Sequence, residues 1–211
     1  MKPGALTKIA AHRGASAEAP ENTLQAFERA IEVGADMIEF DVRRDSSGEL
    51  RISHDPIRRS AAELPTLEET LRLTQGRIQL DVELKEPGCE RDAVELLLRY
   101  FDRKDFCITS FIGTVLGAAR AIDPSIRTGL IFAQWNADVR TACESSDCDL
   151  LVPHHRLVRW AERIGKPMFV WTVDNSRRIG KLMERPSVEA IVTNDPRNAL
   201  AVRATHGTIR A

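Results

Sequence analysis

The side chains best suited to chemistry gather in the N-terminal part of the chain. His12 and Arg13 are adjacent, Glu39 and Asp41 lie one residue apart, and His54 follows shortly afterwards. Histidine gives or takes a proton near neutral pH, and carboxylates hold metal ions or act as bases. This spacing suits a site at the ends of parallel strands, where several strands each deliver one or two residues.

Acidic residues recur on one face of two predicted strands. Side chains along a strand alternate between faces, so Glu39 and Asp41 share a face, and Asp81, Glu83 and Lys85 share a face of the next parallel strand. The residues between them are apolar, as expected for parallel strands that are buried on both sides. Charges on an inward face are costly unless they ligate a metal or line a site. The pattern therefore predicts a polar site inside an otherwise apolar sheet.

Three of these carboxylates, from Glu39, Asp41 and Glu83, form a set of hard oxygen ligands. Such a set suits Mg²⁺ or Ca²⁺ better than zinc, which prefers more histidine or cysteine ligands. His12 ends the first predicted strand, and His54 lies on a hairpin return that can fold back over the site. Two histidines flanking a metal suggest one general acid and one general base. The sequence leaves open which histidine has which role.

The charged residues also indicate the kind of ligand. Arg13 and Lys85 supply positive charge for an anionic substrate, for which a phosphate is the best candidate. Over the whole chain, 30 Lys and Arg residues balance 31 Asp and Glu residues. Nucleic-acid-binding proteins usually carry a basic excess, so this balance argues against a nucleic-acid partner. We expect a small-molecule substrate, and the sequence does not address the oligomeric state.

Several features predict a cytoplasmic protein. The 4 cysteines form no CxxC pair and have no histidine at zinc-finger spacing, which is typical of reduced thiols in the cytosol. The N-terminus has no apolar signal-peptide core, and no run of about 18 apolar residues occurs in the sequence. We therefore expect neither secretion nor a transmembrane segment.

The elements that position these residues repeat as a short β-branched run followed by a longer amphipathic segment. Eight such units, with an extra β-hairpin after the second strand, predict a (β/α)8 TIM barrel in a single domain over residues 1–211. An open doubly wound sheet is the alternative, but no GxGxxG or P-loop motif supports it. The expected strands are residues 8–12, 37–42, 78–85, 106–110, 126–132, 149–152, 168–173 and 189–193.

Together, nine short motifs resemble the glycerophosphodiester phosphodiesterase family in order and spacing. Jointly they are very specific and span nearly the whole chain, although any one alone would be weak. They are His12-Arg13-Gly14, Pro20-Glu21-Asn22-Thr23, Gly34-Ala35-Asp36, Ile38-Glu39-Phe40-Asp41-Val42, His54-Asp55, Pro65-Thr66-Leu67-Glu68-Glu69, Glu83-Leu84-Lys85, Trp171-Thr172-Val173 and Thr193-Asn194-Asp195-Pro196.

The resemblance implies a TIM barrel that hydrolyses a glycerophosphodiester to glycerol 3-phosphate and an alcohol. It also implies a role for each matching residue. A divalent metal, Mg²⁺ or Ca²⁺, would lie on Glu39, Asp41 and Glu83, with His12 and His54 as the acid–base pair, Arg13 and Lys85 on the phosphate, and Trp171 beside the substrate. Considered by itself, Trp171 could instead be core filler.

The chain departs from the family pattern in three places. The segment 56–64 is shorter than the insertion that usually covers the glycerol end of the substrate. Asp174 stands where the family most often has Asn, and Asn194 stands where it most often has Asp; we expect both changes to be minor. In the short segment, Arg58 and Arg59 are expected to be solvated or to meet an anionic head group.

Other polar residues receive structural interpretations. Asn22 is the predicted N-cap of the first helix, with Gln25 as its capping-box partner. Asp81 is expected to form an internal salt bridge. His154 and His155 follow a predicted strand end, so they could reach the mouth of the site, but tandem neighbours point in different directions and we expect both in a surface loop.

Two other functions compete with the leading one. The short segment after His54 could leave the cleft open to a bulkier lipid-type phosphodiester such as a lysophospholipid. Alternatively, the chain could be a non-catalytic barrel that binds a phosphorylated ligand. The second alternative is disfavoured because every matched catalytic position carries a competent residue type.

Overall fold

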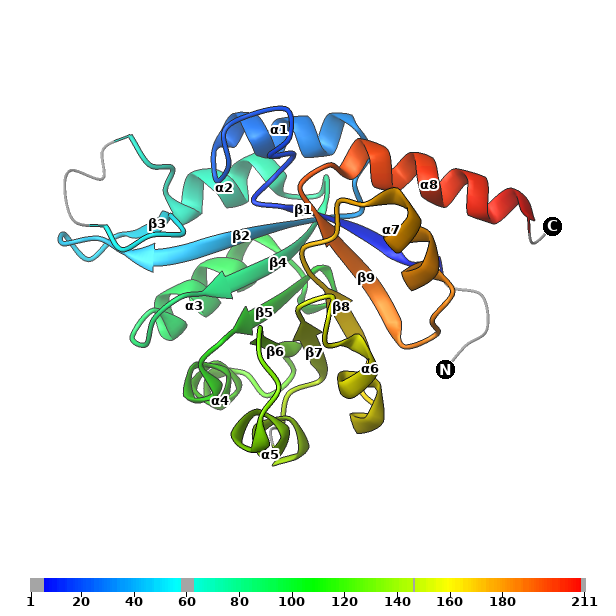
Figure 1. Ribbon diagram of the computed structural model, residues 1–211. Helices are drawn as coiled ribbons and strands as arrows, with labels where there is room; N and C mark the ends of the chain where they lie inside the picture. The colour runs from blue at the N-terminus through cyan, green and yellow to red at the C-terminus, as the bar shows by residue number, and fades with distance from the viewer. Residues whose placement is uncertain (1–5, 58–62, 146, 210–211) are drawn as a thin grey trace.

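The computed structural model describes residues 6–57, 63–145 and 147–209. In these residues, eight parallel strands form a closed barrel, in which β1 pairs with both β2 and β9 (Figure 1). The predicted (β/α)8 barrel is confirmed, and the open doubly wound sheet is wrong. The barrel strands are β1 (Lys8–His12), β2 (Met37–Arg44), β4 (Gln79–Leu84), β5 (Phe106–Ser110), β6 (Thr128–Phe132), β7 (Leu150–Pro153), β8 (Met168–Val170) and β9 (Val188–Thr193).

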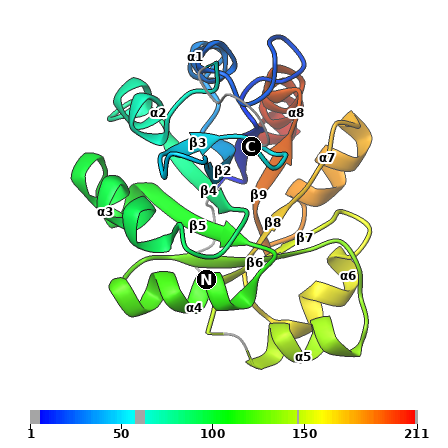
Figure 2. The ribbon, with the colours of Figure 1, turned by 90° about the vertical axis from the view of Figure 1, so that its left-hand side faces the viewer.

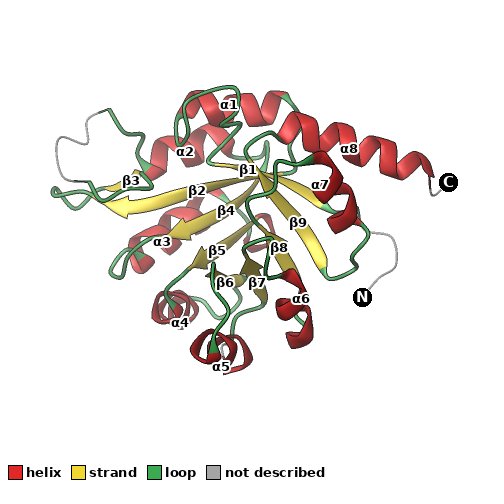
Figure 3. Cartoon of the chain, viewed as in Figure 1, coloured by secondary structure: helices red, strands yellow, loops and turns green. Residues whose placement is uncertain are grey.

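Helices surround the barrel, so that the strands lie at the centre and the helices form a ring outside them (Figures 2 and 3). Across the described parts of the chain, no helix combines the length and the apolar character needed to cross a membrane. The helices are α1 (Leu24–Glu32), α2 (Leu67–Thr74), α3 (Glu90–Tyr100), α4 (Gly113–Ile122), α5 (Ala137–Ser145), α6 (Val158–Ala161), α7 (Ser176–Met183) and α8 (Pro196–Ile209), with single 3-10 turns at η1 (Arg103–Asp105) and η2 (Glu162–Ile164).

The predicted hairpin follows β2. Its return strand β3 (Leu50–Ile52) runs antiparallel to the end of β2. The Asp45 side chain closes the turn by accepting hydrogen bonds from the backbone N–H groups of Ser47 and Glu49, which is typical of an Asx turn. The return strand carries His54 to the cavity at the mouth of the barrel.

The loop from β1 to α1 differs from the prediction. Thr23, not Asn22, is the N-cap of α1, and its hydroxyl accepts a hydrogen bond from the backbone N–H of Ala26. Asn22 adopts a left-handed backbone with φ 57°, which asparagine tolerates better than most residues. The predicted capping box of Asn22 and Gln25 is therefore wrong, and the Asn22 side chain is buried instead.

Gly14 allows this loop to pass close to α1. Its φ is +84°, and a Cβ at this position would lie 2.6 Å from the Cβ of Ala26. Only glycine combines a left-handed backbone with so little volume. The turn that directly follows His12 and Arg13 therefore depends on this residue.

Alternation along the strands divides the buried residues into two groups. Ile38, Phe40 and Val42 of β2 point outward into the layer between the barrel and the helices. The smaller group lines the barrel interior and consists of Ala10, Met37, Cys107, Ile131, Leu150, Val152, Phe169, Ala190 and Val192. At the mouth-side ends of β2 and β4 the inward positions are acidic instead. The barrel interior therefore has an apolar side, on β6 to β9, and a charged side, on β2 and β4.

Candidate active site

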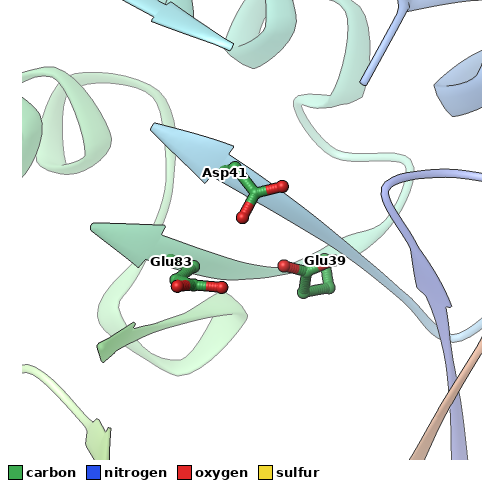
Figure 4. Close-up of side chains that lie close together, drawn as sticks. All are labelled: Glu39, Asp41 and Glu83. Carbon is green, nitrogen blue, oxygen red and sulfur yellow. The ribbon is translucent and has the colours of Figure 1, made fainter. Parts of the chain in front are cut away.

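The three predicted carboxylate ligands meet on the charged side of the barrel. Glu39 and Asp41 project from β2, and Glu83 projects from β4 beside Asp41, its partner in the strand register (Figure 4). One oxygen atom of each carboxylate lies within 4.8 Å of the others. All three side chains are buried. Because parallel strands in register place alternate residues on the same face, two short strands bring three acids together.

Crowding changes the proton affinities of these carboxylates. Burial, together with the charges of Asp41 and Glu83, raises the pKa of Glu39 well above its usual value. Burial and the charge of Asp41 also raise the pKa of Glu83 to about 7. Like charges that are close together and desolvated resist joint ionisation. A bound cation would relieve that repulsion, so the cluster is suited to exchanging protons for a metal ion.

Asp41 has the most positive surroundings of the three. The Nζ atom of Lys85 lies 3.2 Å from Asp41 Oδ1, and the Nε atom of Arg13 lies 3.1 Å from Oδ2. The Asn22 amide also donates a hydrogen bond to Oδ2 over 2.8 Å. Burial raises the pKa of Asp41, but Lys85, Asn22 and Arg13 together hold it below its usual value. Sequence reasoning missed this role of Asn22. The available clue was that Thr23, the next residue, can cap the helix by itself, which leaves the Asn22 side chain without a role there.

Two buried oxygens of the cluster suggest what it can bind. Asp41 Oδ1 and Glu83 Oε1 accept no hydrogen bond of good geometry from the described residues, although Lys85 Nζ lies 3.2 and 2.7 Å away. Buried acceptors are ordinarily hydrogen-bonded. Here the partner of both oxygens is the Lys85 ammonium, and an all-oxygen set that faces a positive charge also fits a hard divalent cation such as Mg²⁺ or Ca²⁺.

Acidic groups hold Arg13 on several sides. Its backbone φ is 56°, and its backbone N–H donates a hydrogen bond to Glu39 Oε2 over 2.9 Å. Its guanidinium contacts Asp41 and donates a hydrogen bond to Glu21 over 2.8 Å. A left-handed backbone is uncommon at arginine and persists only where surrounding contacts fix it. These contacts hold the guanidinium against the carboxylate cluster.

His12 ends β1 beside the cluster. Its Nε2 atom lies 3.9 Å from Glu39 Oε2, and its Nδ1 atom lies 2.7 Å from Asn194 Oδ1. Burial lowers the pKa of His12, and this effect exceeds the opposing effect of the hydrogen bond to Asn194. This lower pKa favours the neutral imidazole, which can accept a proton.

His54 has a more open environment. Its side chain is 43% exposed, and its Nδ1 atom lies 3.0 Å from the carboxylate of Asp55. It nevertheless lines the same cavity as His12, Glu39 and Lys85. The structure thus brings together both predicted histidines, both predicted cations and the carboxylates.

The opposite wall of this cavity is apolar. Trp171 lines it, and its Nε1–H donates a hydrogen bond to the Val152 carbonyl over 2.8 Å, which fixes the indole. Phe111 packs edge-on against Trp171 with ring centroids 5.7 Å apart, and it is 46% exposed. Lys85 Nζ lies 5.7 Å from the Phe111 ring centroid, so the apolar wall meets the charged wall of the cavity at this ring. Sequence reasoning missed Phe111, although it directly follows a predicted strand.

Asp81 does not form the predicted salt bridge. It is buried in register with Glu39, and its carboxylate accepts a hydrogen bond from the Thr109 hydroxyl over 2.7 Å. The Cys107 thiol lies 3.6 Å from the same oxygen. No basic group of the described residues lies within ion-pair distance, and burial raises the pKa of Asp81 to about 6. A neutral hydroxyl donor, not a cation, satisfies this carboxyl group.

His154 and His155 lie in the predicted loop, between β7 and α6, but both are half-buried in it. The His154 ring packs edge-on against Trp171 with centroids 5.6 Å apart, and the two histidine rings are in contact. This places His154 beside the apolar wall. Arg58 and Arg59 lie outside the described residues.

A closed (β/α)8 barrel with buried charged groups around a cavity at its mouth is the arrangement typical of TIM-barrel enzymes. Residues 12–77 match the model of the Glycerophosphoryl diester phosphodiesterase family. A glycerophosphodiester phosphodiesterase of Caldanaerobacter subterraneus is 26% identical, over 90% of this chain and 95% of its own length.

Solved structures show the same fold. A phosphodiesterase of Oleispira antarctica, solved with its product sn-glycerol-3-phosphate, aligns with a TM-score of 0.80 and 23% identity, over 93% of this chain and 96% of the other. A glycerophosphodiester phosphodiesterase of Parabacteroides distasonis aligns with a TM-score of 0.78 and 23% identity, over 95% and 98%. These findings confirm the resemblance of the chain's sequence motifs to the glycerophosphodiester phosphodiesterase family.

Proposed function

We propose that this protein is a metal-dependent glycerophosphodiester phosphodiesterase that releases glycerol 3-phosphate and an alcohol. One observation carries the proposal: a single cavity contains two histidines and two basic side chains beside three buried carboxylates, whose ligand oxygens lie within 4.8 Å of one another. Such a set supplies the three needs of phosphodiester hydrolysis, which are charge stabilisation, activation of a nucleophile and protonation of a leaving group.

Glu39, Asp41 and Glu83 would hold a divalent cation, Mg²⁺ or Ca²⁺. Bound there, the cation supplies Lewis-acid polarisation of the phosphoryl group. Because burial and crowding raise the pKa values of Glu39 and Glu83, metal binding at these two carboxylates would compete with protons. The carboxylates also fix the two cations of the site, Arg13 and Lys85.

Arg13 and Lys85 would bind the phosphate oxygens. Both line the cavity and are kept protonated by neighbouring acids, which raise the pKa of each against the opposing effect of burial. Arginine offers two parallel N–H donors and lysine a compact positive charge, a combination suited to a phosphodiester anion. Trp171 would border the substrate on the apolar wall.

His12 and His54 would move the protons. One takes a proton from the nucleophile, either water or a hydroxyl of the substrate itself. The other gives a proton to the leaving alkoxide, which is otherwise a poor leaving group near neutral pH. Their environments differ, because the His12 side chain is 16% exposed and lies beside an amide, whereas the His54 side chain is 43% exposed and lies beside a carboxylate.

A bulkier lipid-type diester is a second candidate substrate, favoured by the apolar wall. Phe111 is exposed and contacts Trp171 at the cavity, which is also lined by Ile131, Val152 and Val192. Such a wall can accept an acyl chain in place of a small polar alcohol. A higher rate on micellar lysophospholipid than on soluble diesters would favour this substrate.

A substrate panel tests the proposal. Release of glycerol 3-phosphate is measured from several glycerophosphodiesters and a lysophospholipid, with Mg²⁺, with Ca²⁺ and with EDTA. We expect metal-dependent release that EDTA abolishes. Ligand binding without turnover under all metal conditions would contradict the proposal and support a phosphate-binding barrel.

A further inference from the structure

A chain of hydrogen bonds connects His12 to the loops that follow β8 and β9, on the side of β1 opposite to β2 and its carboxylates. Asn194 follows β9, and its Oδ1 atom lies 2.7 Å from His12 Nδ1. Asp174 lies between β8 and α7, and its carboxylate accepts hydrogen bonds from the Asn194 side-chain Nδ2 over 2.8 Å and from the Asn194 backbone N–H over 2.9 Å. None of these contacts involves the carboxylate cluster.

This chain fixes which way the Asn194 amide faces. A carboxylate can only accept hydrogen bonds, so the amide end that faces Asp174 must be the NH₂ group. The end that faces His12 is then the carbonyl oxygen Oδ1. The Ser16 hydroxyl lies 3.1 Å from the same Oδ1 and 3.0 Å from the His12 carbonyl oxygen, so its hydrogen also meets an acceptor there.

The fixed amide in turn sets the tautomer of the imidazole. An amide oxygen accepts but cannot donate, so the nitrogen of His12 that faces it must carry the hydrogen. In the neutral ring the other nitrogen, Nε2, then has a free lone pair. That atom faces the cavity, 3.9 Å from Glu39 Oε2.

We propose that Asp174 and Asn194 are positioning residues that hold neutral His12 in its Nδ1–H tautomer, with the Nε2 lone pair directed into the site. This inference rests on the proposed function for its catalytic meaning. It implies that His12 takes the proton from the nucleophile and that His54 donates to the leaving alcohol. Asp174 and Asn194 were expected to be minor departures from the family pattern, yet they contact each other and act together on His12.

The first test is Asp174→Asn. The new amide can still accept from the backbone N–H of residue 194 and from the Thr193 hydroxyl, but its NH₂ group would oppose the NH₂ group of Asn194. Asn194 would then turn over and present a donor to His12, which moves the ring hydrogen to Nε2. We expect kcat to fall roughly 10- to 100-fold, with KM little changed.

The second test exchanges the two residues, in Asp174→Asn combined with Asn194→Asp. The carboxylate at 194 then accepts from His12 Nδ1, and the amide at 174 donates to that carboxylate. We expect the Nδ1–H tautomer and most of kcat to return. Asn198→Ala is the matched control: Asn198 contacts Ser176 and the backbone carbonyl of Asp174, and its removal should leave the tautomer and kcat unchanged.

Nitrogen-15 NMR of the histidine rings in the metal-free protein at alkaline pH reads the tautomer directly, without turnover. The inference is supported if the hydrogen of the His12 ring moves from Nδ1 in the wild type to Nε2 in Asp174→Asn and returns in the exchange variant, with kcat following it. An unchanged tautomer in Asp174→Asn, or a changed tautomer with wild-type kcat, overturns it. A wild type that shows the tautomer but hydrolyses no diester would overturn the proposed function and the catalytic role, while leaving the positioning of the ring intact.

Discussion

The two sides of the barrel interior use the same strand geometry for different purposes. On β2 and β4, inward positions carry Glu39, Asp41 and Glu83, whereas on β7, β8 and β9 inward positions carry Val152, Phe169 and Val192. Ion pairs with basic groups stabilise the carboxylates of the charged side, and close packing stabilises the apolar side. Substitutions on the charged side should therefore change chemistry more than stability, and substitutions on the apolar side should do the reverse.

His12→Ala and His54→Ala test the charged side with the largest expected effect. We expect each to lower kcat by roughly 10²- to 10⁴-fold, because each removes a proton-transfer group, with a smaller effect on KM. Steady-state kinetics and thermal melting of the same samples check this. If a variant only raises KM and leaves kcat unchanged, the substituted histidine does not transfer a proton and its acid–base assignment is wrong.

Phe169→Ala tests the apolar side. Phe169 is fully buried in the barrel interior, so its truncation should lower the free energy of unfolding by about 3 to 5 kcal/mol through lost burial and a new cavity. Urea denaturation measures the loss, and the kcat of the remaining folded protein should stay near that of the wild type. If kcat fell while stability stayed constant, the contrast between the two sides would be wrong.

Glu83→Gln gives the charged side a pH signature. The pKa of Glu83 is raised from 4.5 to about 7 by burial and by Asp41, so between those values the folded metal-free chain binds more protons than the unfolded chain. The stability of the wild type relative to Glu83→Gln should therefore be highest below about pH 4.5, where Glu83 is protonated in both states, and should decline as pH rises toward 7. Melting temperatures of both proteins across this range measure the difference. A difference that does not change with pH would mean that Glu83 ionises normally.

Phe111→Ala should have the smallest effect. It removes an exposed apolar ring from the cavity wall, and a loss of about 0.5 to 1.5 kcal/mol in substrate contact is expected when one or two CH₂ groups of the alcohol lose part of their burial. We expect a rise in KM of roughly 2- to 13-fold for diesters with an apolar alcohol, and little change for diesters of small polar alcohols. Steady-state kinetics on both substrate types test this prediction. An equal change in KM on both would mean that Phe111 does not recognise the alcohol.

The fold could be predicted from sequence because each strand and helix carries its own local pattern. Strand β5 was placed at its observed bounds, and the acidic faces of β2 and β4 followed from simple alternation. By contrast, Asn22 and Thr23 are adjacent residues of the kinds that cap helices, and the sequence pattern favours the wrong one. Only the backbone conformation, left-handed at Asn22 and extended at Thr23, decides between them.

Long-range partners account for the remaining differences. The connection from His12 through Asn194 to Asp174 joins residues from opposite ends of the chain, and no local spacing indicates it. Asp81 likewise depends on Thr109 of the neighbouring strand, so its hydroxyl partner becomes visible only when β4 and β5 are aligned. Sequence pattern gives the face of a side chain, but its partner depends on strand register.

The most direct measurement compares the wild type with Glu39→Gln in metal binding and in turnover. Metal is removed, and Mg²⁺ or Ca²⁺ is titrated back in a calorimeter while release of glycerol 3-phosphate is followed in parallel, with Asp81→Asn as the control from the same barrel interior. We predict that the wild type and Asp81→Asn bind metal and hydrolyse the diester. Glu39→Gln should stay folded but lose both metal binding and turnover. Its kcat/KM should be lower by roughly a thousand-fold, which corresponds to a loss of several kcal/mol of transition-state stabilisation. Metal binding and turnover in Glu39→Gln equal to those of the wild type would contradict the assignment of the cluster as a catalytic metal site.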